Sequence, residues 1–127
     1  MIASISFTAN GSRINKRLHD YFTEAGEVCE SVALKRYAEE AGLLPLTVSL
    51  KEWCASYFSR ADVLIFIGAT GIAVRGIAPY VRDKKTDPAV IVIDEQANFV
   101  ISLLSGHIGG ANEMTEKLAG LLGAIPV

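Results

Sequence analysis

Short apolar runs alternate with longer amphipathic stretches along this chain. The most apolar run, residues 63–67, holds five residues, three of them β-branched. A run this short and this apolar is typical of a strand buried on both faces. Less pure runs predict four further strands, at residues 2–8, 28–34, 89–93 and 99–104.

Apolar side chains at helical spacing fill the segments between these strands. Asn10 or Ser12 is expected to cap the first helix, which ends at Gly26. The order Ser49-Leu50-Lys51-Glu52 predicts a capping box at the start of a later helix, because the serine hydroxyl and the glutamate can bond reciprocally.

Strands and helices in this order predict a three-layer α/β fold. We expect a mostly parallel sheet of about five strands, with helices on both faces, in a single domain over residues 1–127. The apolar ending at residues 125–127 looks like the start of another strand. We therefore expect the chain to be the N-terminal part of a longer protein.

A glycine-rich turn follows the most apolar strand. It contains Gly68, Ala69, Thr70 and Gly71, and a strand–turn–helix of this kind points backbone N–H groups at a bound anion. The turn is not a GxGxxG motif and lacks the lysine of a P-loop. Arg75, one helical turn later, can offer a guanidinium fork to a carboxylate or phosphate. The alternative is structural: glycine also serves tight turns and close helix packing, and Arg75 is then a solvated surface residue.

A second strand–glycine turn–helix unit covers residues 105–113, which read Ser105-Gly106-His107-Ile108-Gly109-Gly110-Ala111-Asn112-Glu113. A histidine between glycines suits a general acid or base, or a hydrogen-bond donor to a ligand. Ser105, Asn112 and Glu113 are near enough in sequence to orient it or to bind polar groups. The alternative, that His107 and Asn112 only cap the last helix, stays open.

The two glycine turns make a claim about strand direction. Ligand sites in such sheets lie beyond the carboxyl ends of parallel strands. Only residues 94–98 separate the last two strands, so these strands are antiparallel if they pair. If both turns share one site, strand 99–104 runs parallel to strand 63–67, and strand 89–93 is the antiparallel one. We favour this arrangement over the alternative, which puts the turns at opposite ends of the sheet.

Charge and cysteine content exclude several classes of function. The formal net charge is −2 without a basic face, which argues against nucleic-acid binding. No segment reaches the roughly 18 consecutive apolar residues of a membrane span, and no signal peptide is visible. The two cysteines and two histidines lack metal-ligand spacing. A cytoplasmic protein with reduced thiols is expected.

Residues 66–75, 84–90, 92–95 and 99–113 together resemble the N-terminal domain of the CbiG family. These proteins are the cobalt-precorrin-5A hydrolases of anaerobic cobalamin biosynthesis. The resemblance is strong from about Asp62 onward and weaker before it. Because family members continue into further regions, the resemblance implies missing C-terminal domains as partners. A homodimer is a further partner that the sequence leaves open.

The resemblance also implies a reaction. The family opens a δ-lactone on cobalt-precorrin-5A, a contracted tetrapyrrole, and releases acetaldehyde to give cobalt-precorrin-5B. The cobalt arrives with this substrate, so no cofactor of the protein's own is expected. The carboxylates of the substrate suit backbone N–H groups and guanidinium forks.

On this reading the candidate residues take defined roles. His107 is the general base on water or the acid to the leaving oxygen, and Glu113 or Asn112 orients it; axial ligation of the substrate cobalt is the alternative for His107. Both His107 and Glu113 are thus catalytic candidates. The substrate-binding candidates are Gly68, Ala69, Thr70, Gly71, Arg75, Ser105, Gly106, Gly109, Gly110 and Asn112.

Two other functions remain open beside the one that the resemblance implies. The chain could be a non-catalytic module that binds the tetrapyrrole or docks a pathway partner, because only one strong acid–base candidate is present. It could also be a flavodoxin-like domain that binds a nucleotide.

Overall fold

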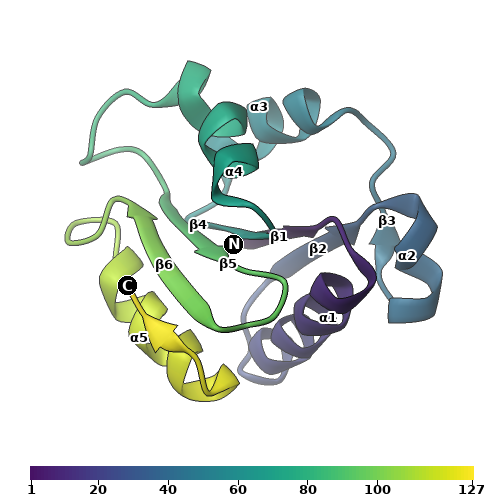
Figure 1. Ribbon diagram of the computed structural model, residues 1–127. Coiled ribbons are helices and arrows are strands. Elements are labelled where there is room, and N and C mark those ends of the chain that lie inside the picture. Colours follow the sequence, from purple (N-terminus) through teal and green to yellow (C-terminus); the bar gives the residue numbers. More distant parts are fainter.

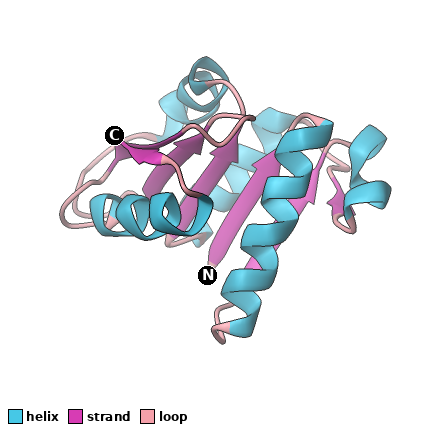
Figure 2. Cartoon of the chain, turned by 60° about the horizontal axis from the view of Figure 1, so that its bottom comes forward, coloured by secondary structure: helices cyan, strands magenta, loops and turns pink.

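In a computed structural model that describes residues 1–127, the chain forms one seven-stranded sheet with helices on both faces (Figures 1 and 2). The strands lie in the order β3-β2-β1-β4-β5-β6-β7. Their bounds are β1 Ile2–Ser6, β2 Cys29–Ala33, β3 Leu44–Pro45, β4 Val63–Ile67, β5 Ala89–Ile93, β6 Phe99–Leu104 and β7 Ile125–Pro126. The helices are α1 Ala9–Glu24, α2 Lys35–Ala41, α3 Leu50–Arg60, α4 Thr70–Ile77 and α5 Ala111–Leu122, with a 3₁₀ turn η1 at Ala78–Tyr80.

The three-layer α/β prediction is confirmed, and all five predicted strands are present. Strand β7 confirms the strand expected from residue 125 onward, whereas β3 was not predicted. Both have two residues and form the two outer edges of the sheet. Each contains a proline, Pro45 or Pro126. Proline has no N–H for the sheet ladder and is tolerated at an edge. None of the helices is long and apolar enough to cross a membrane.

Two hydrophobic layers hold the helices on the sheet. Helices α1 and α5 cover one face, with Leu18 and Leu118 fully buried against it. Helices α3 and α4 cover the other face, where the Trp53 ring meets the Phe66 ring edge-on at 5.7 Å. Ser49 caps α3 as predicted, since its hydroxyl accepts a hydrogen bond from the Glu52 N–H at 3.1 Å. The Glu52 carboxylate lies 3.2 Å from the same hydroxyl rather than on the Ser49 N–H of a complete capping box.

The predicted strand direction is wrong for residues 89–93. Strand β5 is parallel to β4, with Val63 opposite Ala89 and Ile67 opposite Ile93. The reversed strand is β6, which pairs antiparallel with β5, and β7 follows β6 in parallel. The connection through α4 is long enough for a parallel crossover. All five residues of β5 are buried, as in a central strand, whereas β6 is mostly half-exposed beside the edge.

Candidate functional site

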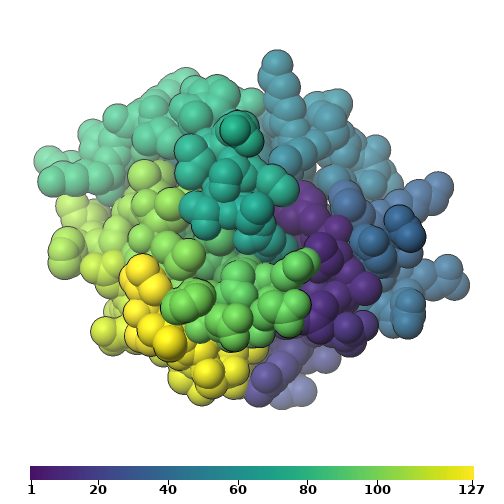
Figure 3. Space-filling model, in the orientation of Figure 1, coloured from purple at the N-terminus to yellow at the C-terminus, as the bar shows by residue number.

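The sheet has a topological switch point between β1 and β4. Helix α1 follows β1 onto one face of the sheet, and α4 follows β4 onto the other. Loops that leave neighbouring strands toward opposite faces create the usual ligand site of open α/β sheets, at the carboxyl ends of the strands. We call this region, made of residues 8–11, 68–71 and Arg75, the carboxyl-edge site. In Figure 3 the purple N-terminal residues, the teal start of α4 and the green β5–β6 connection lie together on the visible face.

The predicted turn at Gly68 to Gly71 lies in this site. The Gly68 N–H donates to the carbonyl of Ile93 at 2.8 Å, which ties the turn to β5. A β-carbon at position 68 would stand 2.9 Å from the Phe7 ring, so the close approach of the two loops requires glycine there. Ala69 precedes α4 without any side-chain cap. The first N–H groups of this exposed helix start are therefore available to an anion.

Arg75 belongs to the same site. Its guanidinium nitrogen lies 3.8 Å from the point where a β-carbon at Gly71 would stand, so the side chain folds back along α4 toward the helix start. The side chain is exposed and forms no ion pair within the protein. Its positive charge adds to that of the helix N-terminus.

The loop after β1 completes the site, although the sequence indicated only a turn there. Thr8 caps α1 in place of the expected Asn10 or Ser12: its hydroxyl accepts from the Gly11 N–H at 2.9 Å. The Asn10 amide donates to the backbone carbonyl of Glu95 and so joins the start of α1 to the β5–β6 connection. The polar turn after the first strand would have indicated these residues if the strand order had been known.

The second predicted turn lies at the opposite end of the strands, where the parallel strands begin. Because β6 is reversed, Ser105 to Gly110 follows its carboxyl end at the edge where β4 and β5 begin. The Ser105 hydroxyl donates to the carbonyl of Asp87, two residues before β5, at 3.3 Å. The expectation that both glycine turns share one site is therefore wrong. They are separated by the length of a five-residue strand, on the order of 15 Å.

Packing within this second turn explains several of its residues. Ser105 adopts a positive φ of 59°, and its carbonyl accepts from the Ala111 N–H at 3.2 Å. A β-carbon at Gly109 would stand 2.5 Å from the Ser105 β-carbon, and one at Gly106 would stand 2.6 Å from the Asn112 amide oxygen. These two glycines thus have structural roles in a compact loop.

His107 and Glu113 are both exposed at this edge. No hydrogen bond or ion pair joins the His107 ring to Glu113 or Asn112. Asn112 instead accepts a hydrogen bond from the Ser102 hydroxyl at 2.7 Å. Helix α5 begins after Gly110 without a side-chain cap, so neither His107 nor Asn112 has the capping role considered as an alternative.

A buried polar network runs beneath α1, between the helix and strands β1 and β2. The Ser6 and Ser12 hydroxyls lie 2.9 Å apart, and Asn15 donates to Ser6 at 3.1 Å and accepts from Ser4 at 2.6 Å. The Ser4 and Ser31 hydroxyls lie 2.7 Å apart and form a further hydrogen bond. The network fixes the start of α1, and hence the loop that it contributes to the carboxyl-edge site.

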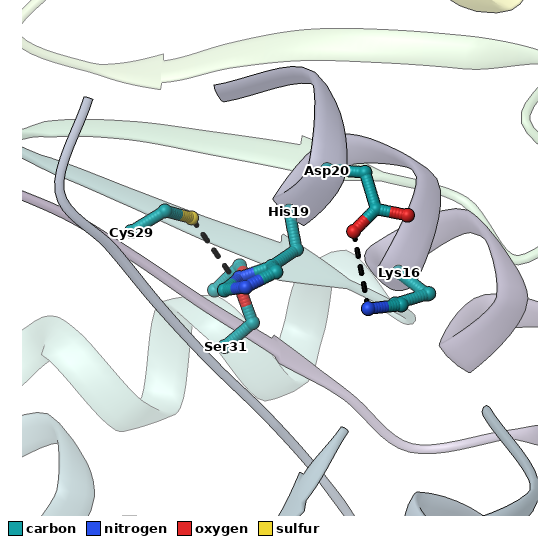
Figure 4. Close-up of polar contacts among 6 residues, drawn as sticks. Lys16, His19, Asp20, Cys29 and Ser31 are labelled. Carbon is teal, nitrogen blue, oxygen red and sulfur yellow. Dashed lines mark hydrogen bonds and ion pairs between the residues drawn. The ribbon is translucent and has the colours of Figure 1, made fainter. Parts of the chain in front are cut away.

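The network extends to the half-buried side chains of His19 and Cys29 (Figure 4). The His19 Nδ1 atom lies 2.9 Å from the Ser31 hydroxyl, and the Cys29 sulfur lies 3.3 Å from it. Burial raises the pKa of the Cys29 thiol. No three of the histidine, cysteine and acidic side chains come together as a metal site.

Comparison with known proteins identifies the family. Residues 52–127 match the family model described as "Cobalamin synthesis G N-terminal". The chain belongs to this family. It is 41% identical over 125 residues to a cobalt-precorrin-5A hydrolase from Priestia megaterium, covering 98% of this chain and 33% of the relative. It is 57% identical over 88 residues to a cobalt-precorrin-5A hydrolase from Salmonella typhimurium, covering 69% of this chain and 25% of the relative.

A solved structure shares the fold of this chain. The crystal structure of a cobalamin biosynthesis protein G homolog from Sulfolobus solfataricus matches 99% of this chain and 35% of its own length. The TM-score is 0.76 at 23% sequence identity, which shows a shared fold. The chain thus spans about a quarter to a third of the length of the curated relatives.

Proposed function

We propose that the chain is part of an enzyme that opens the δ-lactone of cobalt-precorrin-5A and releases acetaldehyde to give cobalt-precorrin-5B. The observation that carries this proposal is the 41% identity to a protein named cobalt-precorrin-5A hydrolase across 98% of the chain. The names of both relatives favour the enzyme over a non-catalytic module. Cobalt belongs to the substrate in this proposal, and the chain supplies no cofactor of its own.

The carboxyl-edge site binds carboxylates of the substrate in this proposal. The uncapped start of α4 supplies N–H groups from the Gly68-Ala69-Thr70-Gly71 turn, and Arg75 lies beside Gly71 with a free guanidinium group. A guanidinium and a helix N-terminus both favour negative charge, and they do so without a strongly basic surface. Arg75→Ala is then expected to raise KM more than it lowers kcat.

His107 is the proposed acid–base residue, with Glu113 as its orienting partner. Both are exposed, His107 in the loop before α5 and Glu113 in the first turn of α5, so a substrate can reach them without opening the fold. Ser105, Gly106, Gly109, Gly110 and Asn112 form the surrounding substrate contacts, and the N–H groups of the glycine pair would stabilise the oxyanion. In this arrangement the substrate contacts two separate surfaces, one at each end of the parallel strands.

The test uses the full-length relative from Priestia megaterium with substitutions at the positions aligned to His107 and Arg75. Acetaldehyde release from cobalt-precorrin-5A is measured. Loss of a general acid or base lowers the rate by about 10²–10⁴-fold. Near wild-type turnover by the His107→Ala equivalent would remove His107 from catalysis. Lys117→Ala, an exposed change on α5, is the matched control.

The proposed partners follow from the same relatives. We propose that the remaining regions of the longer relatives complete the enzyme, and that the protein acts in the cytoplasm, where its two free cysteines stay reduced. A homodimer is the further assembly to be tested, by light scattering of the purified chain.

A further inference from the structure

We propose that a groove between α3 and α4 binds one carboxylate-bearing edge of an amphipathic macrocyclic polycarboxylate, and that Lys51 acts there with Arg75 as a second cation. The macrocyclic nature of the ligand rests on the proposed function. The groove and its charges are features of the structure alone.

The groove has a volume of about 340 Å³. It is lined by Leu50, Lys51, Ile72, Arg75, Gly76 and Pro79. Apart from the two cations, the wall is apolar. A cavity of this size holds a substituted ring edge, and ligand sites typically combine such apolar walls with a few polar groups.

The close packing of α3 and α4 sets the position of the groove. Gly76 faces Cys54 on α3, and a β-carbon at position 76 would stand 2.8 Å from the Cys54 sulfur. Glycine at position 76 therefore lets α4 pack closely on α3 at Cys54, and the groove lies beside this contact. Both helices begin toward the carboxyl ends of the strands, with α3 after β3 and α4 after β4 (Figure 1).

The charges in the groove have no partners within the protein. Lys51 and Arg75 form no hydrogen bond or ion pair, whereas Lys16 pairs with Asp20 at 3.1 Å. Glu52, the neighbour of Lys51, lines a different groove beside Trp53. Two unpaired cations above an apolar wall complement an anionic group attached to an apolar body.

The groove is continuous with the carboxyl-edge site. Arg75 lines the groove, and its guanidinium group also lies beside Gly71 at the start of α4. One carboxylate can therefore contact the helix start and Arg75, while the adjoining ring edge lies on Ile72 and Leu50. A second carboxylate on the same edge reaches Lys51. Two cations on one groove favour ligands with several carboxylates over ligands with one.

The test titrates coproporphyrin III, a tetracarboxylate macrocycle, into the purified chain and follows the Soret band. Lys51→Ala and Arg75→Ala are each expected to weaken binding by about 10-fold or more, because charge-assisted bonds are lost. Lys117→Ala removes an equally exposed lysine on the opposite face and is expected to leave the affinity unchanged. A tetracationic porphyrin is expected not to bind.

A second variant tests the groove without removing a cation. Ile72→Glu places a carboxylate on the wall at a half-exposed position, and circular dichroism checks that the variant folds. It is expected to weaken coproporphyrin binding at least as much as Lys51→Ala.

Three results would overturn the proposal: no coproporphyrin binding to the wild-type chain, equal weakening by Lys117→Ala, or equal affinity for the cationic porphyrin. Failure of the groove is distinct from failure of the proposed function. If the relative releases acetaldehyde but the chain ignores coproporphyrin, only the groove is wrong. If Lys51-dependent binding is found but lactone opening is not, only the proposed reaction is wrong.

Discussion

The amide oxygen of Asn15 on α1 accepts a hydrogen bond from the Ser4 hydroxyl on β1 at 2.6 Å, inside the core. Both residues are almost wholly buried. The Asn15 amide nitrogen donates to Ser6 at 3.1 Å and to the carbonyl of Val32 at 3.0 Å. This single side chain therefore bonds α1 to two neighbouring strands and holds the start of the helix at the carboxyl-edge site.

Replacing Asn15 by leucine is expected to destabilise the protein by about 1–3 kcal/mol, because the carbonyl of Val32 and the serine hydroxyls lose buried partners. The measurement is the free energy of unfolding in urea. Thr23→Ala, an exposed change on the same helix, is expected to stay within about 0.5 kcal/mol. Equal stability of the two variants would show that the network contributes little.

Gly76→Ala is expected to destabilise the protein by about 1–3 kcal/mol, since the new methyl group would overlap the Cys54 sulfur at 2.8 Å. Gly120→Ala is the matched control: nothing lies within 4 Å of its added carbon, and alanine favours a helix, so stability should rise.

The double variant Gly76→Ala with Cys54→Ala separates overlap from other causes. Removing the sulfur relieves the contact, so the combined loss should be smaller than the sum of the two single losses. Additive losses would mean that position 76 does not press on Cys54.

Stability is expected to fall at alkaline pH because of Cys54. Burial raises the pKa of this thiol from its ordinary value of 9.0 to about 11. The folded state therefore keeps a proton that the unfolded state loses. The contribution is fully present below pH 9.0 and is lost as the pH rises toward about 11. Urea unfolding across this window should show a shallower fall for Cys54→Ala; an unchanged slope would contradict the assignment.

Gly109→Ala is expected to disrupt the loop that carries His107. The added carbon would stand 2.9 Å from the Ser105 carbonyl oxygen, a backbone atom that cannot rotate away. We expect a loss of about 1–3 kcal/mol and a shifted NMR signal of the His107 ring. Unchanged His107 resonances, alongside those of the Gly120→Ala control, would show that the loop is less constrained than its packing indicates.

Strand direction shows where sequence reasoning stopped being sufficient. Residues 94–98 require only that strands β5 and β6 oppose each other, and they are compatible with either strand being reversed. The pattern of β5, apolar at all five positions, was the available signal for a central parallel strand. The wrong direction followed from the expectation that both glycine turns share one site, which was preferred to the apolar pattern of β5.

Some residues of the candidate site could be predicted from the sequence, and others could not. The Gly68–Gly71 turn and Arg75 could be predicted because each is a local pattern of a strand, small residues and a helix. Thr8 and Asn10 could not be assigned, since their role depends on β1 lying beside β4, 61 positions apart in the register. Lys51 was also missed, because nothing local brings α3 alongside Arg75.

The sequence by itself determined most of the elements and the α/β class, because apolar periodicity and glycine turns act over a few residues. Its motifs also carried the resemblance to the family, which the comparisons confirm. The tertiary structure decided which strand is reversed and therefore which residues share an edge. The physical reason is that strand direction follows from burial on both faces and from crossover length, and these depend on residues far apart in the chain. The turn at Gly68 and the loop at His107 each join a strand to a helix through glycines, but they lie at opposite ends of the strands.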